Sequence, residues 1–209
     1  MPWILPTLET ERLTLRRLTA DDAEALVSVY DTVEATRYLE ITPLELAEEA
    51  EGLIAIWNDQ QARGTAARWG VTLRQEGELV GTCGFNTLRP NEFQGELSYD
   101  LAPAYWGRGI IPEAARAVLG FGFERLRLTR IQACIVPEGA QSGRVLAKLG
   151  FQREGVLRSA GYWKGRFWDK VCFSLLRQEW DASARVQAEP YLQAGLDRRP
   201  LFVGDAVHH

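Results

Sequence analysis

Histidine is almost absent from this chain, since His208 and His209, the final two of 209 residues, are the only ones. The body of the protein therefore offers no Ser-His or Cys-His catalytic pair and no histidine-based metal site, and we expect no metal. No stretch approaches the roughly 20 apolar residues that a membrane-spanning helix requires. The first residues carry neither a basic lead nor a long apolar core, so we expect no signal peptide. These absences together indicate a cytoplasmic protein without a membrane partner.

Cysteine is also scarce. Cys83, Cys134 and Cys172 are the three in the chain, and each lies in an apolar, strand-like run. An odd number without paired spacing predicts buried thiols in a reducing compartment, not a disulfide framework. The formal net charge of -4 argues against a nucleic-acid partner bound through phosphate contacts. The 46% of hydrophobic residues is enough for one globular core in a chain of this length.

The chain is organised around one stretch, residues 99–113. An apolar run, 97–101, predicts a strand before it, and the helical spacing of apolar residues in 112–126 predicts a helix after it. Proline at the first helical position is a start signal, which places the poorly capping Ile111 at the N-cap. The first-turn N–H groups would then have no side-chain partner. With the two upstream glycines of the stretch, this start predicts an anion site for phosphates.

The type of phosphate site is narrowed by what the stretch does not contain. The dinucleotide-binding fingerprint needs a third glycine where Pro112 stands, and no Gly-x-x-x-x-Gly-Lys-Ser/Thr run occurs in the chain. On its own, the pair Gly107 and Gly109 predicts no more than a tight turn.

The run Trp106-Gly107-Arg108-Gly109-Ile110-Ile111-Pro112-Glu113-Ala114 resembles the acetyl-CoA pyrophosphate loop of the GNAT superfamily of N-acetyltransferases. More narrowly, it resembles the RimJ/RimL branch, which acetylates N-terminal amines of ribosomal proteins, along with relatives that use small amines. Further segments resemble the same branch in the same order: 8–16, 95–99, 137–151, 163–169 and 179–180. The resemblance covers roughly 7–182, so we expect a GNAT N-acetyltransferase domain at 1–182 and a C-terminal tail or arm at 183–209.

The expected fold class is α/β with a mixed sheet. Strands are predicted at 12–18, 67–74, 78–85, 93–101 and 129–136, with a last hairpin turning at Lys164-Gly165. Helices are predicted at 19–30, from Thr42 to about Arg63, at 112–126 and just before Gly150. The helix at 112–126 is a crossover, which makes the strands on either side of it parallel. The resemblance implies the GNAT acyl-CoA N-acyltransferase fold, a central, mostly antiparallel sheet with a splayed parallel pair and helices on both faces.

The resemblance also implies which residues hold acetyl-CoA as co-substrate. Pantetheine would enter the gap between the strands that end near Leu101 and Val136 and pair with the backbone around Tyr99 and Leu101. The expected pyrophosphate-binding residues are Trp106, Gly107, Arg108, Gly109, Ile110 and Ile111. For Arg108, a solvated loop arginine is an equally good interpretation. Two departures from the branch would weaken CoA binding: Gly139 replaces an asparagine that contacts the cofactor, and Ile111-Pro112 replaces alanine-threonine and removes one amide donor.

Two side chains are candidates for catalysis. Glu96 lies at the position where the branch commonly carries a glutamate, and alternation places it on the same face as Ser98, so we expect it to act as the base. A salt-bridged strand carboxylate is the alternative. Ser142 matches a hydroxyl that in some members lies near the CoA sulfur, where it can protonate the thiolate and also contact the cofactor. A first-turn serine that satisfies backbone N–H groups is the alternative. Cys134, without a cationic neighbour, is interpreted as core.

The acceptor amine is left open by the sequence. Deprotonating an α-amine near pH 7 costs about 1 kcal/mol and a lysine nearer 4–5 kcal/mol, so a single carboxylate suits an α-amine better. The leading hypothesis is N-acetylation of a primary amine by direct attack, with a protein N-terminus as one acceptor. The alternatives are a small amine (amino acid, polyamine or antibiotic) and a non-catalytic acyl-CoA-binding module. A homodimer is a further option.

Overall fold

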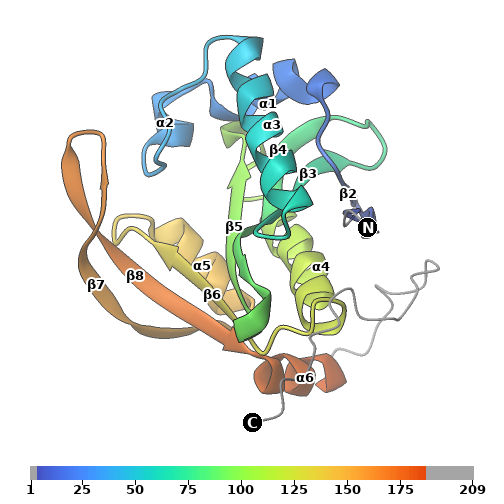
Figure 1. Cartoon of the computed structure of the whole chain (residues 1–209), viewed down its shortest axis with the longest axis vertical. Coiled ribbons are helices and arrows are strands. Elements are labelled where there is room, and N and C mark those ends of the chain that lie inside the picture. The colour runs from blue at the N-terminus through green and yellow to red at the C-terminus, as the bar shows by residue number, and fades with distance from the viewer. Residues whose placement is uncertain (1–3, 187–209) are drawn as a thin grey trace.

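The computed structural model describes residues 4–186, in which an eight-stranded sheet is flanked by helices (Figure 1). The strand order is β1-β2-β3-β4-β5-β6-β8-β7. The strands are β1 (Leu8–Glu9), β2 (Leu13–Arg16), β3 (Ala67–Leu73), β4 (Leu79–Arg89), β5 (Gln94–Leu101), β6 (Arg130–Ile135), β7 (Gln152–Trp163) and β8 (Arg166–Leu176). The helices are α1 (Ala23–Tyr30), α2 (Val33–Thr36), α3 (Ala47–Ala62), α4 (Ile110–Glu124), α5 (Ala140–Lys148) and α6 (Arg177–Val186).

The β5–β6 pair is parallel, and the other strand pairs in the described part of the chain are antiparallel. The two parallel strands are joined by α4 and stay paired only from Gln94↔Arg130 to Glu96↔Gln132. Beyond Glu96 they diverge, as Figure 1 shows, and leave one edge of β5 open. The predicted mixed sheet with a splayed parallel pair is therefore confirmed.

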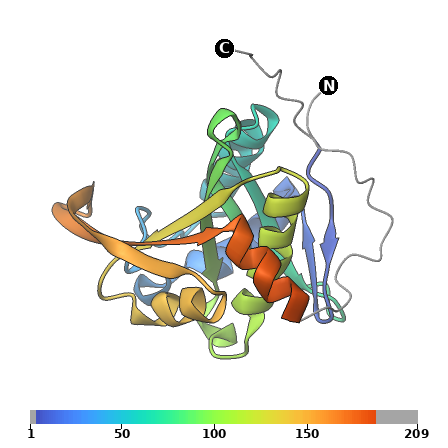
Figure 2. The ribbon, with the colours of Figure 1, turned by 90° about the horizontal axis from the view of Figure 1, so that it is seen from below.

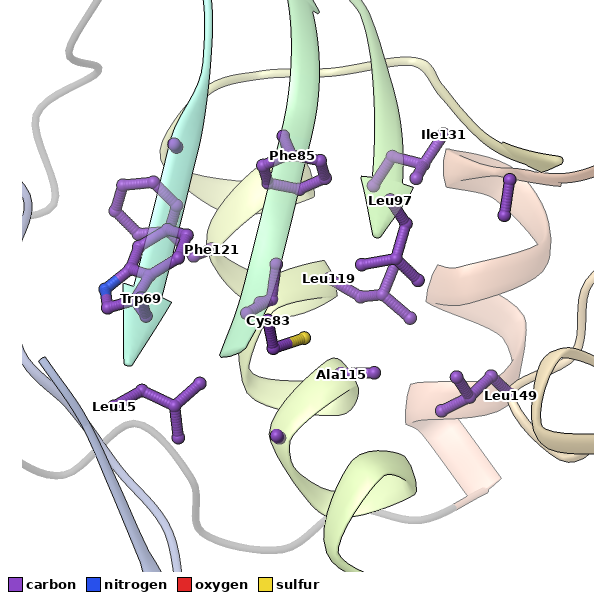
Figure 3. Close-up of a cluster of buried hydrophobic side chains, with 14 of the residues drawn as sticks. Leu15, Trp69, Cys83, Phe85, Leu97, Ala115, Leu119, Phe121, Ile131 and Leu149 are labelled. Carbon is purple, nitrogen blue, oxygen red and sulfur yellow. The ribbon is translucent and has the colours of Figure 1, made fainter. Parts of the chain in front are cut away.

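The main core lies between the sheet and α4. Phe121 of α4 meets Trp69 of β3 edge-on, with ring centroids 5.3 Å apart, and Ala115, Leu119 and Phe85 belong to the same buried cluster (Figure 3). Burying aliphatic and aromatic side chains of this size stabilises the fold by about 1.5–3 kcal/mol each before entropy costs. This core holds α4, and with it the loop in front of its first turn, against the middle of the sheet.

The opposite face of the sheet is covered by α1 and α3. Adjacent residues of β4 divide between the faces, since Leu79 packs with the α1–α3 cluster and Val80 with the α4 cluster. The prediction of helices on both faces is thus confirmed. The last helix, α6, lies beside α4 (Figure 2), where Trp180 stacks on Phe123 with ring centroids 5.7 Å apart.

The start of α3 differs from the sequence-based prediction. The helix begins at Ala47 and not near Thr42, because the Glu49 carboxylate accepts the backbone N–H groups of Glu45 (2.8 Å) and Leu46 (3.1 Å). A cap of this type fixes the helix start where the reciprocal bonds can form. The residues between α2 and Ala47 are thereby left as a connection of turns, bends and irregular backbone.

The interpretation of all three cysteines as thiols is wrong for two of them. Cys134 of β6 and Cys172 of β8 form a disulfide, with Cα atoms 4.3 Å apart. The two residues are directly opposed in the antiparallel ladder, a register that their spacing of 38 residues could not reveal. Cys83 remains a buried free thiol.

The structure bears on two further expectations, the absence of a membrane-spanning helix and the domain boundary, only within the described residues. Within residues 4–186, no helix is both long and apolar enough to cross a membrane. The helix α6 continues past the expected domain boundary at 182, to Val186. The rest of the expected tail lies outside the described residues.

Candidate functional site

A cavity of about 490 Å³ lies on the α3 side of the sheet, where β5 and β6 diverge. Its walls come from α3, the segment 38–41, the two splayed strands and the β7–β8 hairpin. Strand alternation places Glu96, Ser98 and Asp100 of β5 on the cavity face. The volume is within the range of ordinary small-molecule sites.

Glu96 occupies the last paired position before the strands separate. Its Oε2 accepts one hydrogen bond, from Gln132 Nε2 at 3.1 Å across the β5–β6 pair. No ion pair to Glu96 is found among the described residues, so the alternative of a salt-bridged strand carboxylate has no support there. Beside it, β4 carries a bulge in which Asn86 is the extra residue between Phe85 and Thr87. Bulges of this kind re-aim a side chain, and Asn86 also lines the cavity.

Arg68 forms the polar floor of the cavity. Its side chain is 6% exposed and crosses from β3 over Gly84 of β4 to β5. Nη1 donates to Thr82 Oγ1 (2.6 Å) and forms an ion pair with Asp100 Oδ2 (3.1 Å). Nη2 donates to Ser98 Oγ at 3.1 Å and to Asn86 Oδ1. A side chain at position 84 would block this path, because a Cβ there would lie 2.7 Å from the Arg68 Cα.

Two further groups hold this floor in place. The Tyr30 hydroxyl donates to Asp100 Oδ2 at 2.9 Å, and burial together with the neighbouring Asp100 charge raises the pKa of Tyr30 above its ordinary value. The Tyr30 proton therefore stays in the hydrogen bond at any physiological pH. The Trp57 ring covers the guanidinium of Arg68, with Cζ 4.7 Å from the ring centroid. A buried charge that is paired and hydrogen-bonded in this way is rigid.

Arg68, Asp100, Tyr30 and Asn86 were not among the residues predicted from sequence. A signal for Arg68 was present, since it is a charged residue inside the apolar run Ala66-Ala67-Arg68-Trp69. Asp100 could have been found by extending the alternation of Glu96 and Ser98 by one step. The contribution of Tyr30 depends on how α1 packs against the sheet and leaves no local signal.

Ser142 lies in the first turn of α5 and lines the cavity where it reaches the β5–β6 gap. Its Oγ has no hydrogen-bond partner among the described residues, so the bond to a backbone N–H that the alternative required is missing there. Tyr99 reaches across the gap and donates from its hydroxyl to the Ser142 carbonyl oxygen at 3.2 Å. Burial raises the pKa of Tyr99, which keeps this hydroxyl a donor. Glu96, Tyr99 and Ser142 are thus brought together around one cavity.

The expected phosphate loop does not line that cavity; it follows the open end of β5. Gly107 and Gly109 have positive φ of 76° and 75°, which a residue with a side chain adopts only with strain. The Trp106 indole donates to the Leu101 carbonyl oxygen at 2.8 Å, so the loop is tied to the strand end. The Arg108 side chain is exposed, with Cζ 5.0 Å from the centroid of the Tyr105 ring.

The predicted N-cap of the helix after the loop is wrong. The helix α4 begins at Ile110, with Gly109 as N-cap, because glycine adopts positive φ without strain and lets the helix follow the turn directly. Ile110 and Ile111 are buried in the first turn, and Pro112 is the third helical residue. No side-chain cap bond is formed at this end. First-turn amides of α4 still have no side-chain partners, as the sequence predicts, although Pro112 removes one of these amides.

The outer side of the cavity is bridged by contacts between the segment after α1 and the hairpin. Lys164 Nζ donates to the Thr36 carbonyl oxygen at 2.7 Å, and the Tyr38 ring meets the Trp168 ring edge-on, 6.3 Å between centroids. A longer ion pair, 3.6 Å, joins Lys170 to Glu40. These contacts cover the cavity only in part. Its charged lining residues are three carboxylates and two cations: Glu40, Glu96 and Asp100 against Arg68 and Lys170.

These features fit an acyl-CoA. The loop has two glycines at positive φ and a helix start without a side-chain cap, which suits a pyrophosphate. The backbone of β5 beyond Glu96 is not paired to β6, which leaves hydrogen-bonding groups for an extended pantetheine arm. Gly139, the N-cap of α5, lines the cavity without a side chain.

Comparisons with known proteins agree with this geometry. A family model described as an acetyltransferase (GNAT) domain matches residues 12–152. An uncharacterized N-acetyltransferase, p20, of Bacillus licheniformis is 39% identical over 84% of this chain and 99% of its own length. The [Ribosomal protein uS5]-alanine N-acetyltransferase of Escherichia coli is 27% identical over 83% of this chain and 92% of its own. A GNAT-family acetyltransferase structure from Bacillus anthracis is 27% identical, with a TM-score of 0.73, and covers 83% of this chain and 99% of that one.

Proposed function

The chain belongs to the GNAT acetyltransferase family, and on this premise we propose that it moves the acetyl group of acetyl-CoA to an α-amine, with a protein N-terminus as the leading acceptor. The protein is an acetyl-CoA-dependent N-acetyltransferase, related to enzymes named for ribosomal proteins. Acetyl-CoA and ribosomal acceptors are both cytoplasmic, so we propose that location as well. The identity of the acceptor and the residue roles below are parts of the proposal.

One observation carries the proposal: a single cavity extends from the β5–β6 gap, beside Ser142, to the carboxylate of Glu96. A thioester held along the open edge of β5 and an amine entering from the α3 side would meet in that cavity. Holding two reactants together in this way removes much of the entropic cost of a bimolecular step.

Glu96 would take the proton of the attacking amine, directly or through one water, and Gln132 would keep the carboxylate in place. Ser142 would donate a proton to the departing thiolate, since its Oγ has no competing partner among the described residues. The amides of the loop before α4 and of its first turn would hold the pyrophosphate. Acetyl-CoA, when bound, supplies the activated acyl group.

A small amine is the second candidate acceptor. Tyr38, which packs against Trp168, covers part of the cavity, and the excess of carboxylates in the lining favours a compact cation. Only the first one or two residues of a protein N-terminus would fit in the same volume. With either acceptor, a single primary amine would face Glu96.

The test is release of free CoA from acetyl-CoA on addition of peptides with free N-termini, the same peptides with blocked N-termini, and small amines including polyamines. The proposal expects turnover of the free N-termini, no turnover of the blocked ones or of polyamines, and a large loss of turnover in Glu96→Gln. Glu92→Gln, an exposed carboxylate on the loop before β5, is the matched control. Turnover that is confined to polyamines would refute the α-amine assignment.

A further inference from the structure

Arg68 is a donor-only side chain, and this decides how its neighbours are oriented. A guanidinium has no acceptor atom, so Ser98 Oγ and Asn86 Oδ1 must both act as acceptors in their bonds to Nη2. The Ser98 hydroxyl hydrogen is then free to point elsewhere, and the Asn86 amide must present its NH₂ group away from Arg68. The Oδ1 assignment of Asn86 is therefore forced by the chemistry of its partner.

Both freed donors belong to the cavity. Ser98 and Asn86 line it, and neither the Ser98 hydroxyl nor the Asn86 Nδ2 donates to another residue in the part of the chain that the structure describes. Ser98 is two residues from Glu96 on the same face of β5, roughly 7 Å along the strand. Asn86, at the bulge of β4, lies opposite the Glu96–Leu97 step. A carboxylate acceptor and two neutral donors thus lie side by side on the floor.

This spacing matches one chemical unit. The amine nitrogen and carbonyl oxygen of one aminoacyl residue are separated by three covalent bonds, about 3 Å. A hydrogen bond of about 2.9 Å at each end gives that unit a reach of about 9 Å, which is of the same order as the spacing of roughly 7 Å between the Cα atoms of Glu96 and Ser98. A polyamine or simple alkylamine has no oxygen at this position, so it would forgo the net contribution of both hydrogen bonds.

We propose that Ser98 and Asn86, oriented by Arg68, form a subsite for the carbonyl oxygen next to the acceptor amine, so that the enzyme selects aminoacyl amides over other primary amines. This inference rests on the proposed function of Glu96. The oxygen is a neutral carbonyl and not a carboxylate, because the subsite donors are uncharged and the positive charge of Arg68 is already compensated by Asp100. Ser98 and Asn86 are specificity-determining residues, and Arg68 is a positioning residue.

The test compares kcat/KM for glycinamide, which has the adjacent carbonyl, with that for difluoroethylamine, whose amine pKa is also lowered but which has no such oxygen. The wild type should favour glycinamide. Asn86→Asp keeps an acceptor for Arg68 but removes the NH₂ donors, and it should lower the glycinamide preference about tenfold, the effect of one hydrogen bond. Ser98→Ala should do the same, and Ser28→Ala, an exposed serine of α1, is the control.

Arg68 is tested by Arg68→Lys, which retains the charge beside Asp100 but has no planar fork to hold Ser98 and Asn86 together. The glycinamide preference should fall in this variant too, while the pH profile set by Glu96 keeps its shape. If Arg68 served only the fold, Arg68→Lys would lower the turnover of both amines by the same factor. If Arg68→Lys does not fold, the glycinamide preference of Ser98→Ala and Asn86→Asp decides whether the subsite exists.

The outcomes separate this inference from the proposed function. Turnover of both amines with a preference that no subsite variant changes would overturn the subsite and leave Glu96 in its role. Turnover of neither amine by the wild type would overturn both. Two further substrates, a short glycyl peptide and free glycine, test the charge of the oxygen. Equal kcat/KM for the peptide and glycinamide supports a neutral carbonyl. A higher kcat/KM for free glycine overturns it in favour of a carboxylate.

Discussion

Arg12 and Glu113 are joined by an ion pair at the start of α4. Arg12 Nε and Nη2 each lie 2.7 Å from Glu113 Oε2, and the Arg12 backbone N–H donates to Oε1 at 2.9 Å. Arg12 Nη1 also donates to the Arg108 carbonyl oxygen at 3.0 Å, so the same guanidinium fixes the glycine turn. A carboxylate in the first turn would repel phosphates, and Arg12 neutralises it. The pair therefore fixes the shape of the loop at the proposed phosphate site and offsets the negative charge of Glu113 there.

Replacing Glu113 by glutamine should remove part of the acid sensitivity of the fold. Burial opposes ionisation of Glu113, but hydrogen bonds from Thr10 and Arg12 outweigh it and hold the pKa of this carboxyl below its ordinary value. A depressed folded pKa contributes stability above the unfolded value of about 4.3, and this is lost as pH falls through the folded value. Glu113→Gln should cost about 1 kcal/mol at pH 7 and flatten the decline below about pH 5.

Urea unfolding at a series of pH values measures this effect. Glu11→Gln, an exposed neighbour of Arg12, is the control and should follow the wild type. Parallel pH curves for Glu113→Gln and the wild type would contradict the linkage.

Valine at Gly109 should abolish tight binding of acetyl-CoA while the fold persists. A β-branched residue at φ 75° is strained by about 1–2 kcal/mol and would project beside the amides of the cradle. Space alone does not forbid it, since a Cβ there would meet only Arg12 Nη2, at 3.5 Å. Gly77→Val is the matched control, because Gly77 has a φ of 72° in the β3–β4 turn and its Cβ would meet nothing within 4 Å.

Calorimetric titration with acetyl-CoA and with free CoA compares the two variants. Both should lose similar stability, and only Gly109→Val should lose affinity. An unchanged dissociation constant for Gly109→Val would remove the phosphate-loop assignment.

The residues that sequence reasoning placed correctly are those with local signals. The alternation of Glu96 and Ser98, the glycine turn and the crossover around α4 all follow from neighbours in the chain. The N-cap was misplaced by two residues because Gly109 can end a turn and cap a helix at once, and the Pro112 signal concealed this. Where one residue can serve two roles, a local pattern does not choose between them.

Other features depend on strand register, which no local pattern reports. Arg68 reaches Ser98 only because positions 68, 84 and 98 are aligned across β3, β4 and β5 and the middle one is glycine. The pairing of Cys134 with Cys172 requires β8 to return beside β6 at one register. A slip of one residue in either ladder would point these side chains to the other face.

Glutamine at position 96 should slow acetyl transfer by about 10²–10⁴-fold near pH 7 if Glu96 is the base. The loss should shrink as pH rises, because the acceptor amine then loses its proton without help. Rates measured across pH with one peptide test this, and Glu92→Gln, the exposed control, should keep the wild-type profile. A loss of constant size at every pH would mean that Glu96 positions the substrate and does not remove its proton.

The Cys134–Cys172 disulfide should make stability depend on redox conditions. It closes a loop of 38 residues, for which the entropy of the unfolded chain predicts stabilisation of about 3–4 kcal/mol. Alkylation after denaturation without reductant should modify one cysteine, Cys83, and after reduction all three. In the folded protein Cys83 should not react, since burial raises its pKa to about 12. In a reducing cytoplasm the bond would be opened by cellular dithiols, so the stabilisation would belong to the oxidised protein alone.

Thermal unfolding with and without dithiothreitol measures the size of the effect. The wild type should unfold at a lower temperature when reduced, and a Cys134→Ser, Cys172→Ser double variant should be insensitive to the reductant. Because Cys134 also lines the cavity, turnover should be measured in both states of the wild type. Three alkylated cysteines in denatured, unreduced protein, or equal unfolding temperatures, would show that the opposed register of β6 and β8 holds the two strands without the bond.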